Sequence, residues 1–150
     1  MQVKATDLAW AAGILDGEGY LGLYRVRPKT LHNLSGTAMH IEVAMTHEAT
    51  LLRLQQILGG RINGPYTRPN RLTHWKWYTA GQKHVAETIR ALRPYLTTKR
   101  QDAALLLRFV HWRWQQPAIG HYQHLVFPAW VVDHLDSSKK TKGGTSRWKS

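Results

Sequence analysis

Apolar residues alternate with polar ones over some stretches of the chain and recur every three to four residues over others, which predicts strands and helices respectively. The predicted helices are Asp7–Gly17, Glu48–Leu58, His84–Leu92, Arg100–Trp114 and Tyr122–Leu135, and the predicted strands are Tyr20–Val26, Met39–Met45, Arg61–Thr67 and Thr73–Thr79. The segment Arg27–Thr37 contains Pro28 and Gly36, which predicts a loop between the first two strands.

The order of these elements, α-β-β-α-β-β-α-α-α, is typical of an α+β fold whose antiparallel hairpins carry helices on one face. An antiparallel sheet buries that face and leaves the other open. Alternation places Trp75 and Trp77 on the buried face. The open face is then expected to carry Tyr24, His40, Glu42, His74, Lys76 and Tyr78. Such side chains suit base edges in a DNA major groove, although an ordinary solvated face has the same pattern.

The length of 150 residues and a hydrophobic fraction of 43% predict one packed domain over 1–137, followed by a flexible basic tail over 138–150. The sequence has no cysteine, which excludes disulfides and thiolate metal sites and is expected of an intracellular protein. It does not distinguish bacterial cytoplasm, nucleus and organelle.

Positive charge is in large excess, with 21 Lys and Arg against 9 Asp and Glu and a formal net charge of +12. A polyanionic partner, most often nucleic acid, explains this excess better than solubility does. A membrane partner is not expected, because the chain has neither a membrane-length apolar run nor a long basic amphipathic helix. Basic residues expected to contact phosphates are Arg25, Arg27, Lys29, Arg68, Arg71, Lys139, Lys140 and Lys142.

The first predicted helix, with Thr6 or Asp7 as its cap, is apolar or small on every side. Ala9, Gly13 and Gly17 form one stripe without bulk, opposite a bulky side that suits the core. Glycine inside a helix costs about 1 kcal/mol relative to alanine, so the stripe needs a reason. Close approach of another helix supplies one. The simplest partner is a second copy across a two-fold axis, and the alternative is another helix of the same chain.

Two acidic residues, Asp16 and Glu18, end this helix, where the macrodipole already disfavours negative charge. Two Glu18 carboxylates brought together by paired helices would raise the pKa of one of them, or else recruit a cation. Mg²⁺ binds through one or two carboxylates plus substrate phosphates, so the arrangement is typical of metal-assisted phosphodiester hydrolysis. Asp16 is expected to be a local structural hydrogen-bonding group.

Residues 11–19, Ala-Ala-Gly-Ile-Leu-Asp-Gly-Glu-Gly, resemble the nine-residue motif of the LAGLIDADG homing endonucleases in its variant ending Asp-Gly-Glu-Gly. Residues 93–101 resemble the segment that carries the active-site lysine of the family. Residues 129–133 and 136–139 resemble the C-terminal helix and basic tail of members with one motif per chain. The resemblance spans residues 8–142.

The resemblance implies a homodimer that lays a curved antiparallel sheet along DNA as a saddle and cuts both strands of a long, nearly palindromic site with Mg²⁺ or Mn²⁺. Glu18 would bind the metal together with the backbone carbonyl of Gly17, Lys99 would stabilise charge or help position the attacking water, and His47 would organise water. A basic residue common one turn later has no counterpart, because Leu51 occupies its place and Arg53 is the nearest substitute. The dimer interface would include Ala9, Gly13, Asp16 and Gly17.

Two other functions remain open. An RNA-splicing maturase or a cleavage-inactive nucleic-acid-binding relative would keep the fold and lose the cleavage of DNA. A packaging protein without specificity would bind any duplex equally, whereas a homing endonuclease prefers its site by about a thousandfold or more. The histidines His111, His121, His124 and His134 have no zinc-ligand spacing and are expected to be core or surface residues.

Overall fold

The computed structural model describes residues 2–25, 37–116 and 127–133 of the chain. Its elements are α1 (Ala5–Glu18), β1 (Gly19–Arg25), β2 (Thr37–Met45), α2 (Glu48–Leu58), β3 (Arg61–Tyr66), β4 (His74–Ala80), α3 (Gln82–Leu92) and α4 (Arg100–Gln115). Residues 129–133 add a short helix. The first eight predicted elements are therefore confirmed, each within two residues of its predicted start. None of the helices in these described ranges has the length and apolar character that a membrane span needs.

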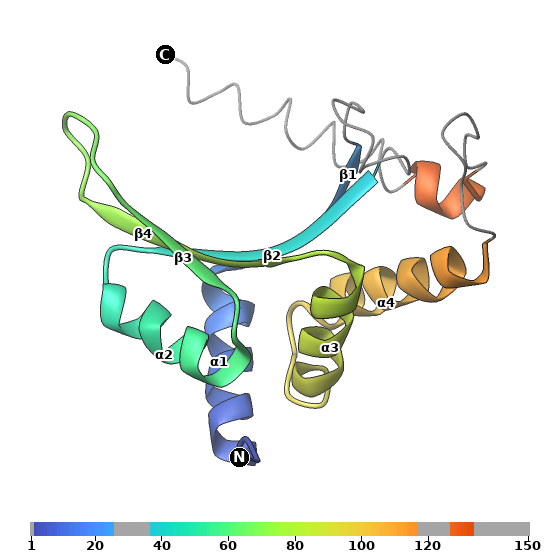
Figure 1. Cartoon of the computed structure of the whole chain (residues 1–150), viewed down its shortest axis with the longest axis horizontal. Helices are drawn as coiled ribbons and strands as arrows, with labels where there is room; N and C mark the ends of the chain where they lie inside the picture. The colour runs from blue at the N-terminus through green and yellow to red at the C-terminus, as the bar shows by residue number, and fades with distance from the viewer. Residues whose placement is uncertain (1, 26–36, 117–126, 134–150) are drawn as a thin grey trace.

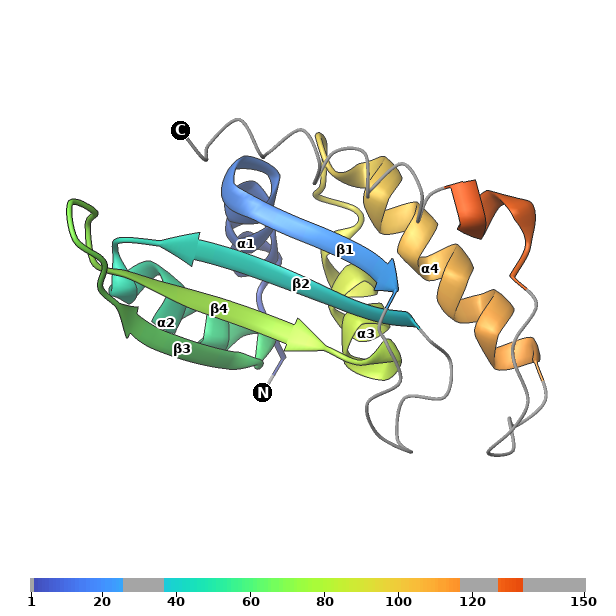
Figure 2. The same ribbon diagram turned by 90° about the horizontal axis from the view of Figure 1, so that it is seen from above.

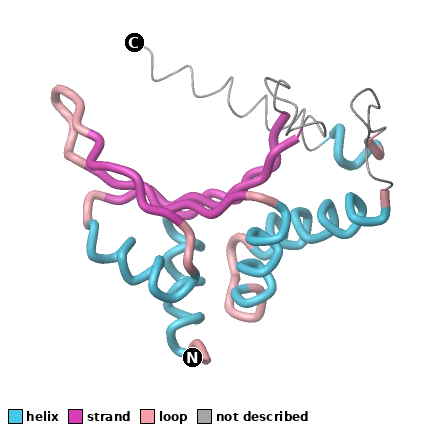
Figure 3. Tube along the Cα trace, viewed as in Figure 1, coloured by secondary structure: helices cyan, strands magenta, loops and turns pink. Residues whose placement is uncertain are grey.

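The four strands form one antiparallel sheet in the order β1-β2-β4-β3. Figure 1 and Figure 3 show that the sheet is curved and that α1 to α4 all cover its convex side. Seen from above in Figure 2, the concave side of the strands is uncovered by the labelled helices. The predicted α+β fold, with helices on one face of a curved antiparallel sheet, is confirmed.

The core lies between the sheet and the helices. Strand positions such as Ile41, Val43 and Trp77 are fully buried, and so are Leu54, Ile89 and Leu106 on the helices. The indole Nε1 of Trp77 donates a hydrogen bond of 2.8 Å to the carbonyl oxygen of Gly59, so the largest buried side chain leaves its polar atom satisfied.

The two ends of α1 differ from the prediction. The residue that precedes the helix is Lys4, which makes no side-chain cap, and neither Thr6 nor Asp7 caps it. Asp7 instead accepts a 3.1 Å ion pair from Arg53 of α2. The helix also runs on to Glu18, and Gly19 starts β1 without a connecting loop. A Cβ at Gly19 would lie 2.6 Å from the carbonyl oxygen of Leu15, so glycine permits this direct junction.

Several predictions fall outside the described residues. These are most of the loop Arg27–Thr37, half of the helix Tyr122–Leu135, and the tail over 138–150. The predicted phosphate contacts in those segments are Arg27, Lys29, Lys139, Lys140 and Lys142.

Candidate active site and nucleic-acid interface

Glu18 ends α1 with its side chain exposed to solvent. The last turn of the helix contains no basic residue that would offset the negative end of the helix dipole. Within the described part of the chain, no hydrogen bond or ion pair to the Glu18 carboxylate is present. A carboxylate in this position adds negative charge to a negative helix end, which makes it a good ligand for an external cation.

Glu18 lies at a hollow of about 410 Å³ where three parts of the fold meet. These parts are the end of α1, the junction between β2 and α2, and the turn between β3 and β4. The hollow brings together Glu18 and His47, two residues assigned to one site from the sequence. The imidazole Nδ1 of His47 lies 2.9 Å from the hydroxyl of Thr50, which orients the ring. The residues that line the hollow are Glu18, Ala44, Met45, Thr46, His47, Arg71, Leu72 and His74.

Asp16 has a different role from Glu18. One of its carboxylate oxygens accepts the backbone N–H of Thr97 at 2.8 Å, and the other accepts that of Lys99 at 2.9 Å. Asp16 is therefore a structural hydrogen-bonding residue as predicted, but its partners are distant in sequence rather than local. The two bonds fix the segment before α4, and with it Lys99, to the end of α1. Lys99 does not line the Glu18 hollow.

The stripe of small residues on α1 faces outward. Ala9, Gly13 and Gly17 are exposed, and a Cβ built on either glycine would meet nothing within 4 Å. The opposite side of the helix packs into the core through Ala11 and Leu15. Packing of the stripe against another described helix of the same chain is therefore wrong, and the stripe is available to a partner.

The open face of the sheet carries all six side chains expected there. The strand register aligns Glu42 with Tyr78 and His40 with Ala80, so the alternation continues from strand to strand. Lys76 and Glu42 form a 2.9 Å ion pair across β2 and β4. Ring contacts join Tyr24 to His40, with centroids 5.1 Å apart, and His74 to Tyr66, with centroids 5.4 Å apart. The face is thus a preorganised array of aromatic, basic and acidic groups.

The strand register adds three further residues to this face. The register places Tyr20 opposite Glu42, and it places Arg61 opposite Tyr78 and Asn63 opposite Lys76. Tyr20 could have been predicted, because it lies four residues before Tyr24 on the same strand and therefore on the same face. Partial burial raises the pKa of Tyr20, and the negative charges of Tyr24, Asp102 and Glu42 add to this effect, so its phenol stays a neutral donor. The array therefore extends across all four strands.

The remaining basic residues occupy different places. Arg68 and Arg71 are exposed near the turn between β3 and β4, and Arg71 also lines the Glu18 hollow. Arg25 ends β1, where the structure describes its backbone. Arg53, the suggested substitute for the missing basic residue, lies over the Trp10 ring with its guanidinium carbon 4.1 Å from the centroid and pairs with Asp7. Asp7 lies 11 positions before Glu18, about 16 Å along the helix, so Arg53 serves helix packing instead.

Solved structures of homing endonucleases have the same fold as this chain. I-CvuI, solved in complex with its target in the presence of 2 mM Ca, is 27% identical, with a TM-score of 0.60, over 71% of this chain and 66% of its own. These structural matches support the LAGLIDADG homing endonuclease family for this chain. The group I intron-encoded I-CeuI, complexed with DNA, is 18% identical over 74% of this chain and 56% of its own, with a TM-score of 0.56.

A third homing endonuclease, I-TnaI, is 19% identical over 77% of this chain and 76% of its own, with a TM-score of 0.53. I-CeuI and I-TnaI share the fold with this chain. The chain spans about two thirds of the length of I-CvuI. No protein-family model and no curated protein matches its sequence.

The metal that the LAGLIDADG family implies fits the residues at the end of α1. Among the described residues, no cluster of three or more His, Asp or Glu forms a ready-made metal site. Mg²⁺ does not require one, because it keeps several waters and takes its other ligands from one or two carboxylates and substrate phosphates. The exposed Glu18 carboxylate and the carbonyl of Gly17, which has no intrahelical partner at a helix end, are the groups that would hold it.

Proposed function

We propose that this chain is a site-specific DNA endonuclease that works as a homodimer and makes a double-strand break in a long, pseudo-palindromic site with Mg²⁺, or with Mn²⁺ in its place. The observation that carries the proposal is the Glu18 carboxylate. It is exposed at the negative end of a helix, lies beside His47 in a hollow, and belongs to a chain of net charge +12. The structures of I-CvuI with its target and of I-CeuI with DNA support this activity for the chain.

Each chain residue has a defined task in this hydrolysis. Glu18 would hold the cation, which when bound would supply charge neutralisation at the phosphate and lower the pKa of water. His47, oriented by Thr50, accepts a hydrogen bond from the attacking water and aligns it with phosphorus. Lys99 places its ammonium where negative charge develops on the phosphate, and Asp16 holds the Lys99 backbone in position. The water oxygen bonds to phosphorus as the bond to the 3′ oxygen breaks.

The surface of α1 supports the proposed homodimer. Among the residues that the structure describes, one chain supplies a single available carboxylate at this place, and the bare stripe of Ala9, Gly13 and Gly17 ends beside it. Two such helices packed along their stripes bring two Glu18 carboxylates, one for each DNA strand, to one region. The symmetric assembly also explains a nearly palindromic site, because each copy presents the same sheet to its half.

Double-stranded DNA is expected to lie along the open face of the sheet. A curved antiparallel sheet enters the major groove, where Lys76 and Tyr78 can reach base edges. The basic residues Arg61, Arg68 and Arg71 flank this face and suit the phosphate backbone.

Cleavage of a randomised duplex library by the purified protein tests the proposal. With Mg²⁺ we expect recovery of one long preferred site with two-fold related halves, and with EDTA in place of Mg²⁺ we expect no cleavage. Failure to enrich any site with active folded protein would contradict the endonuclease. A preferred site that is bound but not cut would favour the cleavage-inactive alternative.

A further inference from the structure

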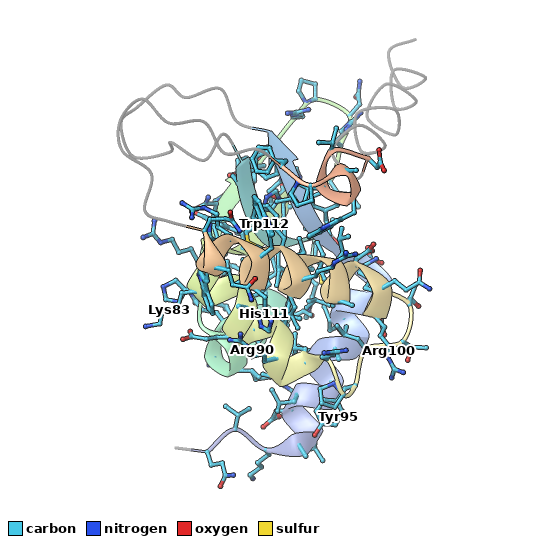
Figure 4. The ribbon with its side chains drawn as sticks, turned by 90° about the vertical axis from the view of Figure 1, so that its right-hand side faces the viewer. Lys83, Arg90, Tyr95, Arg100, His111 and Trp112 are labelled. Atoms are coloured by element: carbon cyan, nitrogen blue, oxygen red, sulfur yellow. The ribbon has the colours of Figure 1, made fainter. Side chains whose placement is uncertain are left out.

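The outer surface of α3 and α4 carries positive charge away from the open face of the sheet. Arg90, Arg93 and Arg100 line a hollow of about 430 Å³ together with Pro94 and Leu107. Figure 4 shows Arg90 and His111 close to each other at the contact of α3 with α4, with Arg100 on the same side of the molecule. Three guanidinium groups around one hollow form a site for anionic oxygens, because each offers a planar fork of donors.

An exposed aromatic ring adjoins this hollow. The side chain of Trp114 is 53% exposed, more than the exposed tyrosines Tyr20, Tyr66 and Tyr95. The Arg90 guanidinium carbon lies 5.7 Å from its ring centroid, and the His111 ring stacks on it at 6.5 Å with an interplanar angle of 22°. Arg90 also lies 3.2 Å from Nε2 of His111. Arg90 therefore connects the arginine hollow to an indole whose position is fixed and whose surface is open.

Acidic residues do not offset this charge. From 82 to 115 the chain has seven Lys and Arg and two acids, Glu87 and Asp102. Glu87 has a cationic partner when His84 is protonated, with its carboxylate 3.7 Å from the imidazole Nδ1. Asp102 is the one acid of α4, which carries three arginines. The surface formed by Arg90, Arg93, Arg100, His111 and Trp114, called here the α3–α4 surface, thus has a one-sided positive potential.

We propose that the α3–α4 surface binds an unpaired nucleic-acid strand, with phosphates on the three arginines and a base stacked on Trp114. Proteins recognise single strands with two components, basic side chains for the phosphates and exposed aromatic rings for the bases. Both act on any sequence, because every base has a face that can stack and every phosphodiester linkage carries a charge. A duplex hides its base faces, so it gains nothing from the indole and is expected on the open face of the sheet instead. Arg100 and Trp114 are 14 positions apart on α4, about 21 Å, which gives an extended strand a continuous track. This site is separate from the open face of the sheet.

Fluorescence anisotropy with labelled 12-nucleotide oligouridylate and oligothymidylate tests the proposal on the full chain in EDTA. We expect Trp114→Ala to weaken binding of the better strand by about tenfold, because stacking on one ring is lost. Arg93→Gln should reduce the salt dependence of log K by about 0.7. Both variants should bind a mixed-sequence duplex within about twofold of the parent. Tighter binding of oligouridylate would assign the strand to RNA, and tighter binding of oligothymidylate would assign it to DNA.

Matched controls separate this site from general charge and exposure effects. Lys4→Gln removes one exposed positive charge from the start of α1, and Leu52→Ala removes an apolar side chain that is 45% exposed on α2. Neither control should change oligonucleotide binding. Equal losses in the controls would overturn the site. Complete displacement of the oligonucleotide by excess duplex would also overturn it, since a separate surface keeps its strand when the sheet is occupied.

Discussion

Asp16 and Glu18 stand two positions apart in the last turn of α1, and their carboxylates have different surroundings. Both oxygens of Asp16 accept backbone N–H groups, from Thr97 and Lys99, at 2.8 and 2.9 Å. The Glu18 carboxylate is exposed beside a hollow and has no such partner among the described residues.

The difference shows how one helix end serves both folding and chemistry. The charge of Asp16 is used within the chain, where it satisfies two donors and holds the start of α4 against α1. The charge of Glu18 is left for a ligand from outside. Substitutions at and around the two positions should therefore separate loss of activity from loss of stability.

The largest effect is expected from Glu18→Gln. We expect DNA cleavage to fall by at least about a thousandfold, because the amide loses the charge that holds the cation. The free energy of unfolding in urea should not decrease, since Glu18 makes no described intrachain contact and its charge opposes the helix dipole. DNA affinity in Ca²⁺ or EDTA, measured by anisotropy, should stay within about threefold. Full cleavage by this variant would remove Glu18 from the active site.

Gly13→Leu tests whether a second copy supplies the other carboxylate. A leucine fits the isolated chain, because nothing lies within 4 Å of a Cβ at Gly13, but it would hold two paired helices apart. We expect sedimentation velocity to show monomer and double-strand cleavage to be lost.

Gly13→Ala is the matched control for this effect. It should keep the dimer and raise the stability of α1 by about 1 kcal/mol, because alanine is the better helix former. A dimer that persists unchanged in Gly13→Leu would place the interface elsewhere.

His47→Ala is expected to reduce cleavage by about a hundredfold while leaving the cation site at Glu18 in place. The imidazole lines the same hollow as Glu18 and is oriented by Thr50. Single-turnover kinetics on the selected site would measure the loss. Thr50→Val should give a smaller loss of the same kind, since the ring stays but its orientation is freed. Unaltered rates in both variants would exclude His47 from positioning the water.

Asp16→Asn is expected to give the smallest loss of cleavage and the clearest loss of stability. The amide keeps one acceptor but turns an NH₂ group toward the second backbone donor. We expect the free energy of unfolding in urea to fall by about 2 kcal/mol. Cleavage should fall by about tenfold through the displaced Lys99. A variant with parental stability and no cleavage would instead give Asp16 a direct role in the chemistry.

Local pattern was sufficient for most of the fold. The alternation around Ile41 and Val43 and the helical spacing of Leu51 and Leu54 predicted elements that the structure has, with those four residues buried. It was not sufficient where long-range contacts decide. Lys4 precedes α1 and makes no side-chain cap, and Asp7 forms an ion pair with Arg53 of α2. The helix begins at Ala5, so Thr6 and Asp7 lie inside it, where they cannot serve as its N-cap.

The candidate site divides in the same way. Glu18 was identified from its place in the motif, and His47 from its place in the resemblance, but only the fold shows that they line one hollow. The reach of Asp16 to Lys99 crosses 83 positions and has no local signature. Tyr20 was missed because the strand was interpreted from its apolar positions, although the same alternation places it beside Glu42 on the open face.

The sequence by itself determined the class of fold, the excess of positive charge, the bare stripe of α1 and the acidic motif that follows it. These properties depend on residue type and short spacing, which are present in the unfolded chain as well. Only the tertiary structure decided which carboxylate is used internally and which is open, and which arginines gather around Trp114. Those outcomes depend on donors and neighbours that chain folding brings from distant positions, where periodicity carries no information.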